Sequence, residues 1–342
     1  MNPVWKMLED LATKKGITEI VINGPKSIFV ERAGEFIGLN ASFSRNDIST
    51  FIKEVADYNR KECDGDNPIL DGNLPDGSRI NIVLEPFCTN FCAITIRKYT
   101  AANLTLDDHS QSFGISEQWV PFFKSIIASR MNVIVSGGTG VGKTTFMNML
   151  VREISPDQRI ITIEDSLELS VSQINNVRLE AGKRLESTGE TISTRELVKN
   201  TLRMRPDRII IGEVRGGEVF DLLQAMNTGH EGSMTSVHAN SSVEALSRLE
   251  TLYLMAGFDL PYHVVRRQMS QAIDFIIQLG KGPGGKRVVK QVLEVNSMEG
   301  NTVLTSSILE TIEGELVSTG VVPSQINKLS EAGLIKRDYF NT

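Results

Sequence analysis

The sequence predicts an α/β protein in which a small α+β domain precedes a larger domain with a mostly parallel sheet and helices on both faces. Three observations lead to this prediction. Residues 1–98 alternate short β-branched runs with helical patterns, whereas residues from 132 onward repeat the order strand, loop, helix. Such a βα repeat is typical of a parallel sheet, because each crossover lays a helix against the sheet. A length of 342 residues also fits two domains better than one.

The N-terminal elements follow from local patterns. Trp5, Leu8 and Leu11 share one face of an amphipathic helix over residues 3–14. Runs rich in β-branched residues, bounded by turn residues, predict strands. The elements predicted after the first helix are strands at Ile17–Val21 and Ser27–Arg32, a helix at Arg45–Asn59, and strands at Arg79–Leu84 and Cys92–Arg97. We therefore predict a small α+β domain over residues 1–98.

The rest of the chain begins with a polar stretch without periodicity, which predicts a linker over residues 99–116. The second domain then covers residues 117–342. Its predicted helices are Glu117–Ser129, Lys143–Glu153, Thr194–Met204 and Gly217–Thr228. Its predicted strands are Val133–Ser136, Ile160–Glu164, Arg208–Gly212, Phe275–Leu279 and Val288–Asn296.

Composition excludes several classes of protein. The net charge of −6 and the isoelectric point near 5.5 speak against broad nucleic-acid coating. No apolar run approaches the roughly 18 residues that span a bilayer, and the N-terminus lacks the pattern of a signal peptide. Three cysteines cannot form a fully paired disulfide framework. Cys88 and Cys92 resemble half of a zinc site, but no second pair follows. These features predict a protein of the reducing cytoplasm.

One loop carries a specific motif. Residues 137–144 match G-x-x-x-x-G-K-[ST] at every position, after an apolar strand and before a helix. Glycines let backbone N–H groups turn toward phosphate oxygens, and the helix N-terminus adds partial positive charge. We expect Lys143 to reach the β- and γ-phosphates of ATP and the Thr144 hydroxyl to bind Mg²⁺. The predicted nucleotide-binding residues are Gly138, Thr139, Gly140, Val141, Gly142, Lys143, Thr144 and Thr145.

Acidic residues end two of the predicted strands. Glu213 follows the apolar run 208–212 and is expected to support Mg²⁺, through water rather than directly. Glu164 and Glu168 follow the strand 160–164. Strand ends on one edge of a parallel sheet converge on the ligand crevice, so either carboxylate could orient or deprotonate the attacking water. A solvated acidic loop is the alternative interpretation of this second cluster.

Histidines and arginines add further candidates. His238 ends an apolar–polar alternating strand and could sense the γ-phosphate, although a structural histidine is an equal alternative. The spacing of His230, Glu231 and His238 matches no usual zinc pattern. Arg79 and Arg97 lie in the small domain, where an arginine could reach a phosphoryl group from another domain or subunit. Without further information they would be ordinary surface arginines.

Together these motifs resemble the type II/type IV secretion ATPase superfamily. The motifs are the P-loop, the acidic box Ile163–Glu168, the stretch Gly212–Gly216 and the histidine box Thr228–Asn240. The segments Leu202–Arg208, Asp76–Asn81, Thr95–Lys98 and the tail near Gly320–Leu334 are similar to the tight-adherence (Flp) pilus assembly branch, the CpaF type. The chain differs from that branch in lacking a long helical N-terminal extension, and from some type II relatives in lacking a tetracysteine zinc module.

The resemblance implies a function and a set of partners. It implies a homohexameric ring in which a RecA-like P-loop ATPase domain follows the small domain, with ATP and Mg²⁺ between them. It implies that Arg79 and Arg97 reach the phosphates, that an acidic-box glutamate positions water and that His238 couples the site to domain movement. The expected machine is a tight-adherence pilus, extended or retracted from the inner face of the cytoplasmic membrane through a membrane platform protein. A type IV secretion traffic ATPase, a RecA-like nucleic-acid translocase and a nucleotide-binding subunit without turnover are the alternatives.

Overall fold

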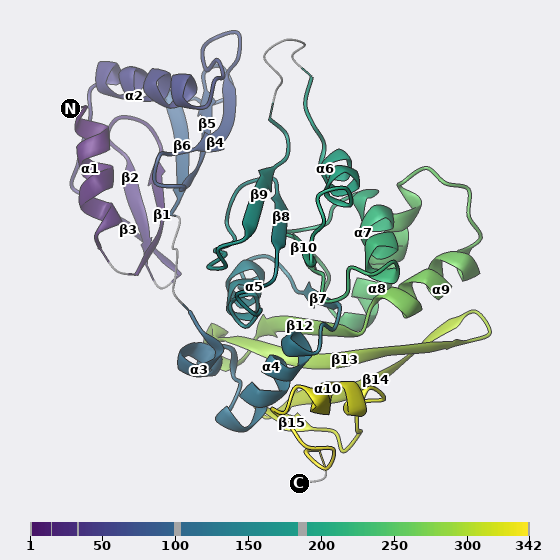
Figure 1. The fold of residues 1–342 in the computed structure, drawn as a ribbon. Coiled ribbons are helices and arrows are strands. Elements are labelled where there is room, and N and C mark those ends of the chain that lie inside the picture. Colours follow the sequence, from purple (N-terminus) through teal and green to yellow (C-terminus); the bar gives the residue numbers. More distant parts are fainter. Residues whose placement is uncertain (1, 15, 33, 99–103, 184–189, 341–342) are drawn as a thin grey trace. The chain divides into compact units, whose positions relative to one another are not determined.

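The computed structural model describes residues 2–14, 16–32, 34–98, 104–183 and 190–340. The chain divides into two compact units, Met1–Ala101 and Ala102–Thr342, hereafter the N-terminal unit and the C-terminal unit. Figure 1 shows the elements of each unit. None of the helices within the described ranges has both the length and the apolarity needed to cross a lipid bilayer.

The N-terminal unit is an antiparallel sheet with two helices. Its strands lie in the order β3-β2-β1-β6-β5-β4. Their bounds are Ile17–Ile22 (β1), Ile28–Arg32 (β2), Glu35–Gly38 (β3), Ile69–Asn73 (β4), Arg79–Leu84 (β5) and Cys92–Arg97 (β6). The helices are α1 (Pro3–Ala12) and α2 (Arg45–Tyr58). Side chains of both helices and of buried positions on β1, β2, β4, β5 and β6 form one apolar cluster.

The C-terminal unit is built on a nine-stranded mixed sheet in the order β15-β14-β13-β12-β7-β11-β10-β8-β9. The strands from β12 to β9 run parallel to their neighbours, and β12 to β15 pair antiparallel. The bounds are Val133–Ser136 (β7), Ile160–Glu164 (β8), Asn176–Glu180 (β9), Arg208–Ile211 (β10), Met234–Val237 (β11), Phe275–Lys281 (β12), Arg287–Glu299 (β13), Thr302–Ile312 (β14) and Glu315–Ser318 (β15).

Helices cover both faces of this sheet (Figure 1). Their bounds are Leu106–His109 (α3), Val120–Ala128 (α4), Lys143–Arg152 (α5), Thr194–Thr201 (α6), Glu218–Asn227 (α7), Ser242–Leu254 (α8), Tyr262–Ala272 (α9) and Ile326–Glu331 (α10), with 3₁₀ turns at Ser110–Phe113, Glu117–Trp119 and Pro283–Gly285. Strand β7 shows the division: Val133 and Val135 join the cluster that contains α4 and α5, while Ile134 joins the one that contains α7 to α9. Both faces of the central strands are therefore buried, as in other parallel sheets.

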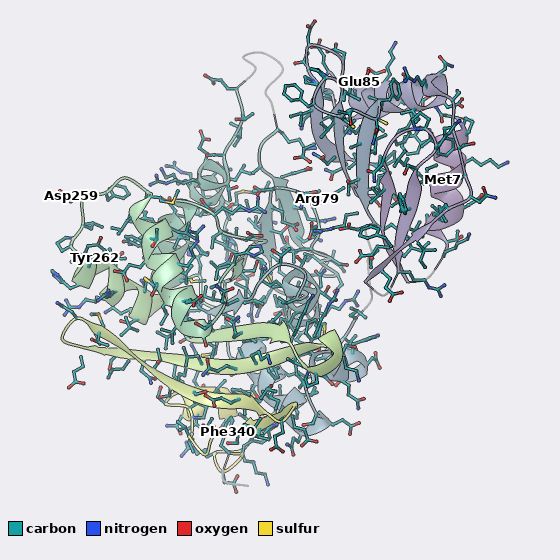
Figure 2. The ribbon with its side chains drawn as sticks, turned by 180° about the vertical axis from the view of Figure 1, so that it is seen from behind. Met7, Arg79, Glu85, Asp259, Tyr262 and Phe340 are labelled. Atoms are coloured by element: carbon teal, nitrogen blue, oxygen red, sulfur yellow. The ribbon has the colours of Figure 1, made fainter. Side chains whose placement is uncertain are left out.

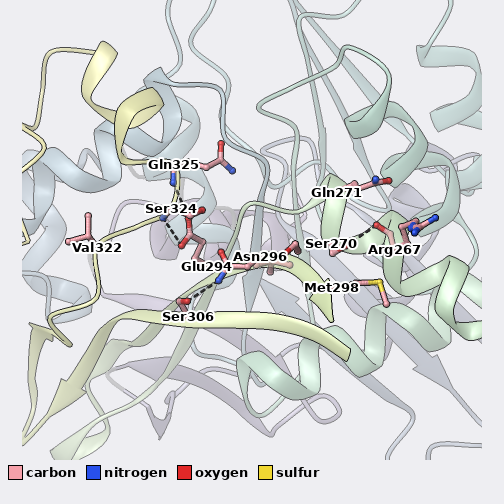
Figure 3. Close-up of a pocket in the computed structure, with 12 residues that line it drawn as sticks. Arg267, Ser270, Gln271, Glu294, Asn296, Met298, Ser306, Val322, Ser324 and Gln325 are labelled. Atoms are coloured by element: carbon pink, nitrogen blue, oxygen red, sulfur yellow. Dashed lines mark hydrogen bonds between the residues drawn. The ribbon is translucent and has the colours of Figure 1, made fainter. Parts of the chain in front are cut away.

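Residues 319–340, which follow β15 and are hereafter the C-terminal segment, are attached to the sheet by polar contacts. Glu294 on β13 is 1% exposed and accepts hydrogen bonds from the Ser324 hydroxyl at 2.8 Å and from the backbone N–H groups of Ser324 and Gln325. Gln325 in turn donates to Asp274 at 2.6 Å. Figure 3 shows Glu294, Ser324 and Gln325 in the wall of a cavity of about 740 Å³ between α9, β13 and this segment.

The observed architecture agrees with the predicted fold class, but several elements differ from the prediction. Strands β3, β4, β9, β14 and β15 and helices α8, α9 and α10 were not among the predicted elements. In the stretch predicted as a linker, residues 104–116 carry α3 and a 3₁₀ turn, and Leu106, Phe113 and Ile115 are buried in the C-terminal unit. Residues 99–103 lie outside the described residues. Burial of these three apolar side chains attaches residues 104–116 to the core of the C-terminal unit.

Candidate functional site

The P-loop connects β7 to α5 and depends on its glycines. Gly140 and Gly142 have φ values of +74° and +90°, in the left-handed region that disfavours other residues. A Cβ on Gly137 would lie 2.6 Å from the Val141 side chain, so the tight turn requires glycine there as well. A Cβ on Gly138 or Gly140 would meet nothing within 4 Å, so the loop is open on that side. The sequence thus folds into a cradle with room above it.

The N-terminus of α5 supplies hydrogen-bond donors to this cradle. The N–H of Phe146 makes the first helical hydrogen bond, to the Gly142 carbonyl at 2.9 Å. The amides of Lys143, Thr144 and Thr145 precede that bond and have no helical acceptor. Such amides, together with the helix dipole, form a binding site for phosphate oxygens.

Lys143 is buried in the cradle, with 8% of its surface exposed. Its ammonium group donates to the carbonyl oxygens of Gly137 and Gly138 at 3.0 Å each, and its Nζ lies 3.3 Å from both ring nitrogens of His238. Burial lowers the pKa of Lys143, while the nearby Glu213 opposes that effect. The structure therefore brings Lys143 and His238 into contact.

Glu213 and His238 meet because β10 and β11 are parallel neighbours. The His238 Nε2 lies 3.3 Å from Glu213 Oε1. Burial and then the charge of Lys143 lower the pKa of His238, which favours the neutral imidazole, while Glu213 opposes this effect. Arg215 donates to Glu213 at 3.1 Å and lies 3.4 Å from Asp165. Arg215 therefore contacts residues of both acidic motifs.

The two glutamates that the sequence left as alternatives, in the acidic loop 164–169, have different surroundings. Glu164 is 4% exposed, and its Oε1 accepts hydrogen bonds from the backbone N–H groups of Glu168 and Leu169 at 2.9 and 2.8 Å. Its Oε2 is buried and has no hydrogen-bond partner among the described residues. Burial raises the pKa of Glu164 to about 7, against the effect of the two amides. Glu168 is partly exposed.

Asn148 is a site residue that sequence reasoning missed. It lies on α5 four residues after Thr144, so the two side chains share one face of the helix. Its Nδ2 donates to the Glu168 carbonyl at 3.3 Å, and its Oδ1 accepts from the Ser170 N–H at 2.7 Å. The available signal was a polar residue within the otherwise apolar run Phe146–Val151.

Arg79 and Arg97 belong to the N-terminal unit, whereas the P-loop belongs to the C-terminal unit. The two arginines are direct cross-strand partners on β5 and β6. Arg97 also pairs with Glu19 on β1 at 3.0 Å, and both are partly or largely exposed. Figure 2 labels Arg79 on this sheet. The structure thus brings the two predicted arginines together as neighbours.

Comparison with known proteins decides the family. Residues 5–296 match the family described as type II/IV secretion system proteins. The chain belongs to this family.

Relatives within the type II/IV secretion family are similar over most of their length. The conjugal transfer protein TrbB of Rhizobium radiobacter is 34% identical over 306 residues, which cover 88% of this chain and 91% of TrbB. The type IV secretion system protein VirB11 of Bartonella henselae is 31% identical over 330 residues, covering 85% of this chain and 90% of VirB11. Among solved structures, the Legionella pneumophila ATPase DotB has a TM-score of 0.62 at 20% identity, covering 86% of this chain and 81% of DotB. That last likeness concerns the fold alone.

The residues of this family member fit a nucleotide with Mg²⁺. The cradle has an open side, its lysine has only neutral partners among the described residues, and unused amides point from the helix N-terminus. The Thr144 hydroxyl and the Glu213 carboxylate are hard oxygen donors of the kind that Mg²⁺ prefers beside phosphate oxygens. Together these features suit a triphosphate, with anionic groups toward Lys143.

Proposed function

We propose that this protein is an ATPase motor that hydrolyses ATP to ADP and phosphate and powers a type IV secretion machine of the conjugal transfer kind. The observation that supports ATP hydrolysis is the meeting of Lys143, Glu213 and His238 beside the P-loop cradle. The kind of machine is supported by TrbB and VirB11, whose names refer to conjugal transfer and type IV secretion.

In this proposal the P-loop binds the phosphates. Backbone amides of residues 138–145 donate to the β- and γ-phosphate oxygens, and Lys143 leaves its carbonyl partners to pair with them. When bound, Mg²⁺ neutralises charge that develops on the phosphates, and Thr144 and Glu213 would hold it, the latter through water. Because Lys143 contacts His238 at 3.3 Å, its movement toward a phosphate changes the electrostatic surroundings of His238. In this way, His238 transmits the presence or absence of a bound phosphate to Glu213 and to β11, the strand that His238 follows.

We propose that Glu168, rather than Glu164, orients the attacking water. One oxygen of Glu164 is already used by two backbone amides, and the residue is almost completely buried. Glu168 is more exposed and lies close enough to Arg215 to raise the pKa of that guanidinium, together with Glu213 and Asp165. A carboxylate near the other catalytic groups with access to solvent suits the general-base role.

The remaining parts of the proposal come from the family resemblance. Arg79 and Arg97 are proposed to contact the phosphates and to stabilise the charge of the transition state. The active form is proposed to be a homohexamer at the inner face of the cytoplasmic membrane, bound to a platform protein of the secretion machine. Differential affinity of nucleotide for two conformations would supply the work.

The ATPase assignment is tested by Lys143→Ala. We expect the purified variant to lose ATP turnover by at least about 1000-fold, because one charge-bearing phosphate contact in a buried site is removed. Lys286→Ala, at an exposed lysine of the loop before β13, is the matched control and should hydrolyse ATP as the wild type does. Equal turnover in wild type and Lys143→Ala would show that the site is assigned wrongly.

A second candidate machine is the tight-adherence pilus. It is favoured by the segments Leu202–Arg208 and Asp76–Asn81, which are similar to the CpaF type, while the relatives reported above favour conjugal transfer. A deletion strain complemented with wild type or Lys143→Ala separates the two. Loss of plasmid transfer with normal surface pili supports the secretion machine, and loss of pili with normal transfer supports the pilus. A RecA-like translocase would instead show DNA-stimulated ATPase activity.

A further inference from the structure

Asn148 connects the P-loop helix to the acidic loop. The residue is 8% exposed on α5, where its neighbours Phe146, Met147, Met149 and Leu150 are buried and apolar. Its side-chain amide donates to the Glu168 carbonyl and accepts from the Ser170 N–H. Burying an amide is unfavourable unless its hydrogen bonds are made, and both of these go to the backbone of one loop.

Glu164 holds the same loop from the opposite side. Its carboxylate accepts from the backbone N–H groups of Glu168 and Leu169 at 2.9 and 2.8 Å. Leu169 is completely buried and anchors the loop in the core beneath α5. Both backbone groups of Glu168 are thus bound by side chains, the N–H by Glu164 from β8 and the C=O by Asn148 from α5.

Gly212 fixes Glu164 against the next strand. A Cβ at position 212 would lie 3.0 Å from the Glu164 Cγ, so the backbone after β10 packs directly on this carboxylate. Glu213 follows immediately. The acidic loop is therefore tied to both of the elements that carry Mg²⁺-facing groups in the proposed site, the start of α5 and the end of β10.

We propose that Asn148 and Glu164 are positioning residues that set the backbone of Glu168, so that a shift of α5 on nucleotide binding moves the carboxylate that orients water. This inference rests on the proposed function as an ATPase. Asn148 is the part that responds to nucleotide, since it shares a helix face with Thr144. Glu164 is the fixed part, held in the core by its own burial and by Gly212.

The test is a double-mutant cycle on ATP turnover with Asn148→Ala and Glu168→Gln. We expect Asn148→Ala to lower kcat about tenfold and to leave KM for ATP within about twofold, because only the transition state uses the positioned water. In the Glu168→Gln background, measured by single-turnover hydrolysis of radiolabelled ATP, the same change should lower the rate less than about twofold.

Gln173→Ala is the matched control. Gln173 is also a buried amide, 4% exposed, which donates to the Val151 and Ile154 carbonyls at the other end of α5 and does not contact Glu168. It should reduce thermal stability without lowering kcat. Asn148→Asp is a second variant of the same size that keeps the acceptor for Ser170; it should lower kcat too, because its oxygen faces the Glu168 carbonyl.

The outcomes separate the inference from the function on which it rests. Equal tenfold losses in both backgrounds, or a raised KM with unchanged kcat, would overturn the positioning role of Asn148. A wild type without turnover, or a Glu168→Gln variant with full turnover, would instead overturn the proposed catalytic assignment. A tenfold loss of kcat in Gln173→Ala would show that any loss of α5 packing has the same effect.

Discussion

At the scale of single residues, the proposed nucleotide site depends most on a cation whose partners are neutral. Lys143 contacts two carbonyl oxygens and the imidazole of His238, and within the described part of the chain no carboxylate lies in ion-pair range of it. Burying a cation that has no carboxylate in direct contact is costly, and burial lowers the pKa of Lys143 although the charge of Glu213 opposes that effect. An anion that enters the cradle removes this cost. The same residue thus makes the empty site unfavourable and the phosphate-bound site favourable.

The buried carboxyl group of Glu164 should make the stability of the protein depend on pH. Burial raises its pKa from 4.5 to about 7, so between these pH values the unfolded chain releases a proton that the folded chain keeps. The free energy of unfolding therefore falls as pH rises through this range, by about 3 kcal/mol at most. Glu164→Gln should lack this decrease. Urea unfolding of both proteins between pH 4.5 and 7.5 measures it, and a difference between their stabilities that does not change with pH would contradict the raised pKa.

The site residues differ in how far the sequence could predict them. The P-loop was predictable because its spacing alone specifies the glycines and the lysine. The choice between Glu164 and Glu168 was not, because it depends on which of the two turns inward under Gly212, and both lie in one short acidic loop. Asn148 required the contact between α5 and that loop, which involves residues 20 positions apart.

At the scale of elements, strands with β-branched residues and buried alternate positions were predicted closely. Observed β5 and β6 have the predicted bounds, and β1 differs by one residue. Two of the missed strands lack that pattern. All four residues of the edge strand β3 are exposed, and β4 contains Asp71, Gly72 and Asn73, which are poor strand formers. Strands β3 and β4 form because they pair with β2 and β5, and such pairing cannot be read from the sequence.

The missed helices α8 and α9 carry many charged and polar residues around a narrow apolar stripe. Asp259 in the connection between them and Tyr262 at the start of α9, both labelled in Figure 2, are exposed. The apolar residues that reach the core are Ala245, Leu249, Leu252 and Tyr253 of α8 and Val265, Met269 and Ala272 of α9. Tertiary packing rather than local pattern therefore identifies these helices.

The N-terminus of helix α2 is stabilised by a capping box, whose contribution can be measured. Ser44 and Asp47 form a capping box, in which the Ser44 hydroxyl accepts from the Asp47 N–H and the Asp47 carboxylate accepts from the Ser44 N–H. Ser44→Ala should destabilise the N-terminal unit by about 1 kcal/mol. Denaturant unfolding followed by the fluorescence of Trp5 measures this. Ser42→Ala, at an exposed serine just outside the helix, is the control, and an equal loss there would exclude the cap as the cause.

At the scale of the whole molecule, each unit contains one of the two tryptophans. Trp5 lies in the N-terminal unit, where its indole donates to Glu54 and packs against Phe51. Trp119 lies in the C-terminal unit, donates to the Leu316 carbonyl and stacks on Phe340. The two fluorophores therefore report on different units. In a Trp5→Phe variant, Trp119 is the remaining tryptophan, and it packs against Tyr339 and Phe340.

This probe tests how the C-terminal segment is held. Glu294 binds Ser324 and Gln325 with a buried carboxylate, and hydrogen bonds to a charged group contribute about 1.5–3 kcal/mol each at their strongest. Glu294→Ala in the Trp5→Phe background should lower the unfolding free energy seen by Trp119 by about 3 kcal/mol. It should also make residues near 320–325 more sensitive to proteases, because Ser324 and Gln325 lose their shared acceptor.

Glu299→Ala, on an exposed position of the same strand, should change neither quantity. The size of the loss in unfolding free energy shows whether polar or aromatic contacts hold the C-terminal segment. If Glu294→Ala cost well under 1 kcal/mol, the aromatic contacts of Trp119, Phe122 and Phe340 would hold the segment without the polar ones. A loss near 3 kcal/mol, with cleavage confined to the segment, would instead show that a polar contact on β13 attaches the end of the chain to the sheet that carries the P-loop.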